Sequence, residues 1–169
     1  DFSISHELKI DHSIICPIIT TRPQADLPIV PIYTNIFAPP LPNPKRFWDL
    51  GRAIREIIDE YPTDKKIAAI GSGHLSLELG GPRQFGETGP DPVFDRKAID
   101  WLASGDIDAI LENVTQESMS PAGNATHCFL DLSLMMRIAG PVKADYVDEL
   151  DLFHTRKMYM TYYPGGDPP

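Results

Sequence analysis

A chain of 169 residues is about the length of one domain, and its 42% hydrophobic and 23% charged residues are ordinary for a globular protein with a buried core. A net charge of -9 and an isoelectric point near 4.9 argue against a nucleic-acid partner and against an anionic membrane surface. No stretch reaches the ~20 apolar residues of a membrane span, and two cysteines are too few for a disulfide framework. We therefore expect one domain over residues 1–169, located in the cytoplasm.

The first third of the chain contains one segment that could be either a strand or a helix, and one expected strand. Residues 13–19 are apolar and rich in β-forming side chains, but Pro17 argues against a regular central strand, so a short helix fits equally well. Residues 27–37 are rich in Ile, Val and Tyr and predict a strand. The proline-rich residues 38–44 predict a stiff, irregular connector.

A strand, helix, strand pattern centres on residues 45–61. Apolar residues recur there at three- and four-residue spacing with charged residues opposite, which predicts a helix that ends before Pro62. Residues 67–70 form a short apolar run before Gly71 and predict a buried strand. Such a βαβ unit implies parallel strands, so we expect an α/β fold with a mixed central sheet flanked by helices.

The second half of the chain is predicted to be mainly helical. Helices are expected at residues 95–104, 107–113 and 126–138, the first stopped by Gly105 and the last broken by Gly140. Residues 84–92 and 118–124 predict loops, and residues 144–152 predict either a strand or a loop. The Met- and Tyr-rich residues 153–163 indicate core or a subunit contact.

Three residues are candidates for a functional site. His74 follows the expected strand 67–70, where α/β sheets hold ligands, although a hydrogen-bonded structural histidine fits this place equally well. His12 follows Asp11, but residues adjacent in sequence need not pair. Asp131 is a charge on a mostly apolar segment, so it needs a buried arginine, a helix end or a metal as partner, unless it belongs to an exposed polar stripe.

Two other kinds of site are disfavoured. The turn at residues 71–73 lacks the glycine spacing and the following lysine of a phosphate-binding loop. Cys16 and Cys128 lack the spacing of a structural zinc site.

A series of landmarks resembles the catalytic chain of the class III extradiol ring-cleavage dioxygenases, the family of protocatechuate 4,5-dioxygenase and gallate dioxygenase. Asp11-His12 resembles the family's Asp-His motif, and residues 46–55 resemble its RRFWxxGRxxRxxI helix. Residues 71–83 resemble its GTGGLSHQLQGPR strand and turn. The resemblance covers most of the chain and implies that the chain is the C-terminal portion of a larger domain.

The resemblance implies a dioxygenase that opens the ring of a small aromatic diol beside its hydroxyl groups, using O2. In the family, a non-haem Fe(II) is held by two histidines and one carboxylate, with open positions for a catechol and O2, while a nearby histidine acts as acid and base. The family's two metal-binding histidines lie upstream of anything in this chain. An N-terminal segment or a second chain would then complete the site, and the protein would be a homo- or hetero-oligomer.

Two positions of this chain depart from the family pattern. Alignment by the glycines puts Leu77 where the family has its catalytic histidine. Alignment by Met136-Arg137 puts Phe129 at the position of the metal-binding glutamate, whereas alignment by Gly140 puts Asp131 there.

From the resemblance we assign His12 to holding or protonating the substrate, His74 to the acid/base role and Asp131 to the third iron ligand. The alternative, which Leu77 and Phe129 motivate, is a non-catalytic structural subunit that pairs with an active partner.

Overall fold

The computed structural model describes residues 4, 6–86, 88–152 and 155–165. These residues form two compact units, residues 1–33 and residues 34–169, and each unit is described by itself. The expectation of a single domain stays a prediction.

The first unit contains helix α1 (His12–Thr21), so the helical alternative for residues 13–19 is the correct one. The carboxylate of Asp11 caps the helix by accepting a hydrogen bond from the Ser13 amide at 3.0 Å. Pro17 lies inside the helix and removes one backbone hydrogen-bond donor from it.

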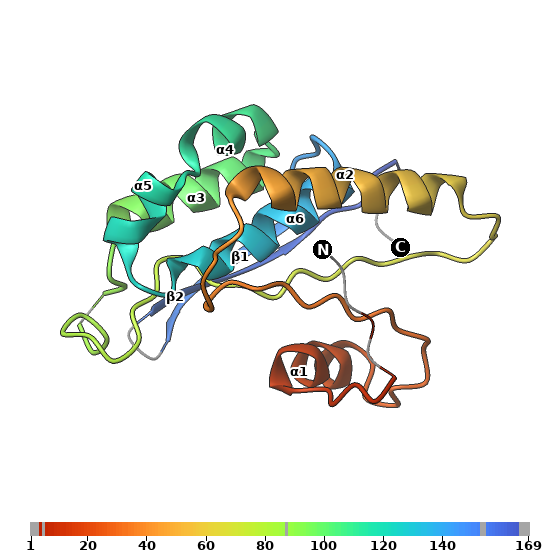
Figure 1. Ribbon diagram of the computed structural model, residues 1–169. Helices are drawn as coiled ribbons and strands as arrows, with labels where there is room; N and C mark the ends of the chain where they lie inside the picture. The colour runs from red at the N-terminus through yellow and green to blue at the C-terminus, as the bar shows by residue number, and fades with distance from the viewer. Residues whose placement is uncertain (1–3, 5, 87, 153–154, 166–169) are drawn as a thin grey trace. The chain divides into compact units, whose positions relative to one another are not determined.

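The second unit contains the other helices (Figure 1). They are α2 (Pro44–Glu60), α3 (Pro92–Ser104), α4 (Ile107–Asn113), α5 (Gln116–Met119) and α6 (Phe129–Ala139), with short 3-10 helices η1 (Ser120–Ala122) and η2 (Thr126–Cys128). The helices expected at residues 45–61, 95–104, 107–113 and 126–138 are thereby confirmed. The loop expected at residues 118–124 is largely wrong, because α5 and η1 occupy most of it.

The two strands lie near the C-terminus. Strands β1 (Tyr146–Leu152) and β2 (Thr155–Thr161) pair antiparallel, with Tyr146 opposite Thr161 and Leu152 opposite Thr155. The strand alternative for residues 144–152 is therefore the correct one.

The strands expected at residues 27–37 and 67–70 are not formed, and neither is the parallel βαβ unit. A strand exists only where a neighbour shares its backbone hydrogen bonds, and the described residues offer these two segments none. The mixed α/β class is confirmed, but the sheet of the described residues is this antiparallel pair and not a mixed central sheet.

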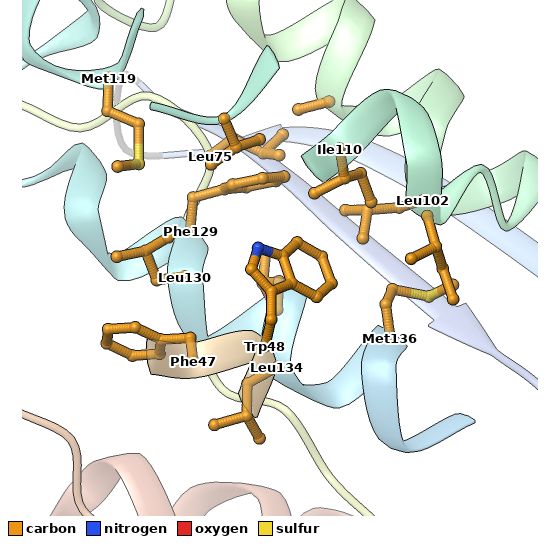
Figure 2. Packing of buried hydrophobic residues seen from close by; sticks show 14 of the residues in the cluster. Phe47, Trp48, Leu75, Leu102, Ile110, Met119, Phe129, Leu130, Leu134 and Met136 are labelled. Carbon is orange, nitrogen blue, oxygen red and sulfur yellow. The ribbon is translucent and has the colours of Figure 1, made fainter. Parts of the chain in front are cut away.

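The hydrophobic core of the second unit lies where α2 packs against α6 and where α3 and α4 cover the other side (Figure 2). Phe47 and Trp48 enter it from α2, and the rings of Phe94 and Phe129 meet edge to face with centroids 5.5 Å apart. Phe129 is fully buried, so the start of α6 is anchored in this core. Within the described part of the chain, every helix is too short or too polar to cross a bilayer.

Candidate functional site

The segment that carries His74 lies directly against helix α6 because two of its residues are glycines. A Cβ atom added at Gly71 would lie 2.7 Å from Cβ of Met135. A Cβ atom at Gly73 would overlap the carbonyl oxygen of Cys128 and lie 2.9 Å from Cγ of Leu132. Only glycine permits this close approach, so the turn places His74 beside the start of α6.

His74 contacts a lysine from the C-terminal hairpin. Nζ of Lys157, on β2, lies 3.0 Å from Nδ1 of His74, and both side chains are half-buried. Burial lowers the pKa of Lys157, and a charge on Cys128 would act in the opposite direction. His74 thus lies in an irregular segment, not at the end of a strand, and has a basic neighbour.

Asp131 lies in the first turn of α6, where the helix dipole favours a negative charge. The hydroxyl of Thr34 donates a hydrogen bond of 2.6 Å to Oδ1 of Asp131. Burial raises the pKa of Asp131, and the Thr34 hydrogen bond partly offsets this. The hydrogen-bond partner that the structure provides for this carboxylate is Thr34, which is none of the partners expected from the sequence.

Cys128 lies one helical turn before Asp131 and is buried. Burial, and then the charge of Asp131, raise the pKa of the Cys128 thiol to about 11, while Lys157 acts in the opposite direction. Asp131 and Lys157 therefore lie around the same end of α6. The thiol stays protonated near neutral pH and is not a nucleophile.

Leu77 has its backbone held by the turn that precedes α6. Its amide donates to Oγ1 of Thr126 at 3.1 Å, and its carbonyl accepts from the amide of Ala125 at 2.9 Å. The half-buried leucine side chain cannot bind or release a proton. The position that alignment by the glycines gives to the family's catalytic histidine is thus held by two backbone hydrogen bonds, and its side chain cannot transfer a proton.

Asp95 binds the backbone of the same segment, at Ser76. Its side chain is 1% exposed, and Oδ1 accepts a hydrogen bond of 2.7 Å from the amide of Ser76. The hydroxyl of Ser76 in turn accepts from the amide of Asp91 at 3.1 Å. Burial raises the pKa of Asp95, while the Ser76 hydrogen bonds lower it. This network joins residues 75–79 to the start of α3.

The structure distinguishes Phe129 from Asp131 as a possible ligand. Phe129 is in the core against Phe94, with an exposure of 0%, so no ion can reach this position. Asp131 is half-buried and carries an oxygen donor. Between the two positions that alignment allowed for the carboxylate ligand, only that of Asp131 remains chemically suitable.

Two of the three predicted site residues, His74 and Asp131, lie in the second unit. His74 and Asp131 both lie near the start of α6, but they have different hydrogen-bond partners. His12 is the exposed first residue of α1 and belongs to the other unit, with which it is described. The roles assigned to these three residues stay predictions.

Sequence reasoning missed Lys157, Thr34 and Asp95. The β-forming residues Thr155, Tyr159 and Thr161 could have indicated a strand at residues 155–161, but nothing in the sequence singles out Lys157. No pattern in the sequence marks the partnership of Thr34 with Asp131 or of Asp95 with Ser76.

The described residues do not by themselves fit an iron site. Across residues 4, 6–86, 88–152 and 155–165, no group of three or more His, Cys, Asp or Glu side chains is placed to hold a metal ion. Asp131 is a single donor, and Leu77 and Phe129 provide none. A two-histidine, one-carboxylate site would need ligands in addition to these.

A family model and several curated relatives of this chain point to the same protein family. The family model described as the catalytic LigB subunit of aromatic ring-opening dioxygenase matches residues 1–157. A gallate dioxygenase of Pseudomonas putida is 29% identical over 107 residues, which cover 62% of this chain and 31% of that protein.

Two further relatives are named 2,3-dihydroxyphenylpropionate/2,3-dihydroxicinnamic acid 1,2-dioxygenase. The one from Photorhabdus laumondii is 32% identical over 92 residues, covering 54% of this chain and 28% of the relative. The one from Xanthobacter autotrophicus is 26% identical over 168 residues, covering 75% and 53%. The chain thus spans between about a quarter and a half of the length of these curated relatives.

Proposed function

This chain belongs to the LigB family of aromatic ring-opening dioxygenases, and from that premise we propose that the protein opens the ring of an aromatic diol with O2 in the extradiol manner. The observation that carries the proposal is the family match over residues 1–157. The relatives' names add gallate and 2,3-dihydroxyphenylpropionate as the first compounds to test.

In this proposal the described residues supply part of a site. His74 takes the acid/base role that Leu77 cannot perform, since it is the histidine of the same segment and has Lys157 beside it. Asp131 supplies one carboxylate oxygen. His12, from the first unit, holds or protonates the substrate.

The metal of the family enters the proposal only as a requirement. Extradiol enzymes of this class use a non-haem metal, for which we propose Fe(II), and the described residues do not complete its site. The missing ligands would come from an N-terminal segment or from a second chain. Support comes from the length of the relatives, about half or more of which has no counterpart in this chain.

The test is an oxygen-uptake assay on the full-length protein, prepared with any segment that precedes Asp1 and reconstituted with Fe(II) without air. We expect O2 consumption that depends on gallate or 2,3-dihydroxyphenylpropionate, together with bound iron. His74→Gln should lower the rate at least tenfold, whereas Ser72→Ala, an exposed neighbour, should leave it unchanged.

A full-length protein that binds no iron and consumes no O2 with either diol would overturn this proposal. The alternative of a structural subunit predicts a further result. In that case the chain associates with a ligand-bearing partner, and Leu77→His restores no activity. The comparisons do not favour this alternative, and the inert Leu77 and Phe129 are the observations behind it.

A further inference from the structure

The contact between Lys157 and His74 is unusual because the lysine has a histidine, not a carboxylate, as its partner. Nζ of Lys157 lies 3.0 Å from Nδ1 of His74. Across the described residues, no Asp or Glu oxygen lies within ion-pair distance of this Nζ. A half-buried lysine without a carboxylate loses the interaction that normally keeps it charged.

The hairpin explains why no carboxylate reaches Lys157. In the register of the two strands, Lys157 lies opposite Leu150, while the neighbouring Arg156 lies opposite Asp151. Arg156 takes the acidic residues of β1, with Nε 3.1 Å from Oδ1 of Asp151 and Nη1 3.9 Å from Oε2 of Glu149. Side chains alternate across a strand, so Lys157 points to the other face from Arg156, toward the segment of His74.

The charge state of Lys157 decides which nitrogen of His74 carries the proton. A charged ammonium group can only donate, so it would hold Nδ1 as an acceptor and leave the proton on Nε2. An uncharged amine can accept from Nδ1–H, which leaves Nε2 as a base. The same contact is thus compatible with both tautomers of His74. The state with charged Lys157 contains one proton more than the state with uncharged Lys157.

We propose that His74 and Lys157 form a two-residue proton relay, in which a proton taken up at Nε2 of His74 is stored on Nζ of Lys157. In the uptake step, a bond forms between Nε2 and the incoming proton while Nδ1 releases its own proton to Nζ. The ring stays neutral throughout, and Lys157 becomes the ammonium. Reversal of both transfers returns the proton from Nε2.

This relay gives Nε2 both roles that an acid/base group needs. With Lys157 uncharged Nε2 accepts, and with Lys157 charged Nε2–H donates. Burial, which lowers the pKa of Lys157, favours the accepting state at a lower pH than an exposed lysine would allow. The two groups titrate as a pair, so the proton belongs to neither residue alone.

Other titratable groups lie near the pair, at the start of α6 and on the hairpin. From η2, directly before α6, the neutral thiol of Cys128 lies near Lys157, and Asp131 lies one turn further along the chain. From the hairpin, Arg156 is paired with Asp151 and Glu149, and Glu149 also binds Arg96 of α3. Arg156 and its acidic partners are therefore engaged with one another, and the thiol of Cys128 carries no charge near neutral pH.

The catalytic use of the relay rests on the proposed function, but its existence is measured without turnover. The protein is labelled with nitrogen-15 in the histidine rings, and long-range proton–nitrogen correlation spectra are recorded over a range of pH. His74→Gln assigns the His74 signals. The buried His127, which contacts Gln116 at 3.0 Å, provides an internal check that each variant is folded.

Two substitutions separate the relay from a merely structural contact. In the unaltered protein we expect the His74 proton to move from Nδ1 to Nε2 as the pH falls, before the ring becomes doubly protonated. Lys157→Met should abolish this exchange of tautomers. Lys157→Arg should keep the proton on Nε2 at every pH at which the ring carries a single proton, because a guanidinium group cannot be deprotonated in proteins.

Identical tautomer behaviour in the unaltered protein and in Lys157→Met would overturn the relay, as would a doubly protonated ring that forms without any exchange. If Lys157→Met loses the His127 signal, the result with Lys157→Arg decides alone. A relay that is present in an inert protein would refute only the proposed function. An active enzyme without the tautomer exchange would refute only the relay.

Discussion

Replacement of Gly73 by alanine tests whether the glycine turn positions His74. The new Cβ would overlap the backbone carbonyl of Cys128 and lie 2.9 Å from Cγ of Leu132, so either residues 71–74 or α6 must move. Overpacking of this kind costs about 1–3 kcal/mol. Alanine also restricts the unfolded chain, which favours folding by about 0.4–1 kcal/mol. The central values of these two ranges leave a loss of about 1.3 kcal/mol in the free energy of unfolding.

Urea unfolding followed by tryptophan fluorescence measures this loss, since both tryptophans, Trp48 and Trp101, lie in the second unit. The matched control is Ser72→Ala, whose exposed side chain should change stability by less than about 0.5 kcal/mol. The Gly73→Ala variant should also shift the ring signals of His74, because the turn moves away from Lys157. A Gly73→Ala protein that is as stable as the unaltered one would refute the close approach.

Two further predictions follow from buried titratable groups. Because burial raises the pKa of Asp95 above 3.8, the folded state holds this proton more tightly than the unfolded chain, so the carboxyl stabilises the fold most at low pH and progressively less as the pH rises through the raised pKa. Asp95→Asn, whose amide oxygen can still accept from Ser76, should therefore gain stability relative to the unaltered protein as the pH rises through this raised pKa. Urea titrations at a series of pH values measure the difference, and a difference that does not change with pH would contradict this. Iodoacetamide at neutral pH should label the exposed Cys16 much faster than the buried Cys128, whose pKa is about 11. Equal labelling of the two thiols, measured by mass spectrometry, would show that Cys128 is neither buried nor of raised pKa.

Local patterns allowed the helices to be predicted from the sequence. The apolar spacing of residues 45–61 and the stop at Gly105 indicated α2 and the end of α3, and the structure has both. Helix hydrogen bonds join residues four apart, and caps lie within one turn, so a short window of sequence contains the whole signal. The family landmarks are local in the same way, which is why the resemblance was visible before the fold.

Contacts between distant residues could not be predicted in this way. The sequence indicated strands at residues 27–37 and 67–70, but a strand depends on a neighbour that local pattern does not reveal, and the pairing that forms is the β1–β2 hairpin. The burial of Phe129 in the core was likewise not visible from the sequence, because burial depends on which helices pack together.

The candidate site shows most clearly the difference between what local sequence patterns indicate and what depends on contacts between distant residues. The sequence by itself identified the family, singled out His74 and Asp131, and revealed that Leu77 cannot act as the family's histidine. Only the tertiary structure joined His74 to Lys157, 83 residues further along the chain, and Asp131 to Thr34, 97 residues before it. Proton chemistry depends on atoms about 3 Å apart, and folding alone brings such atoms together.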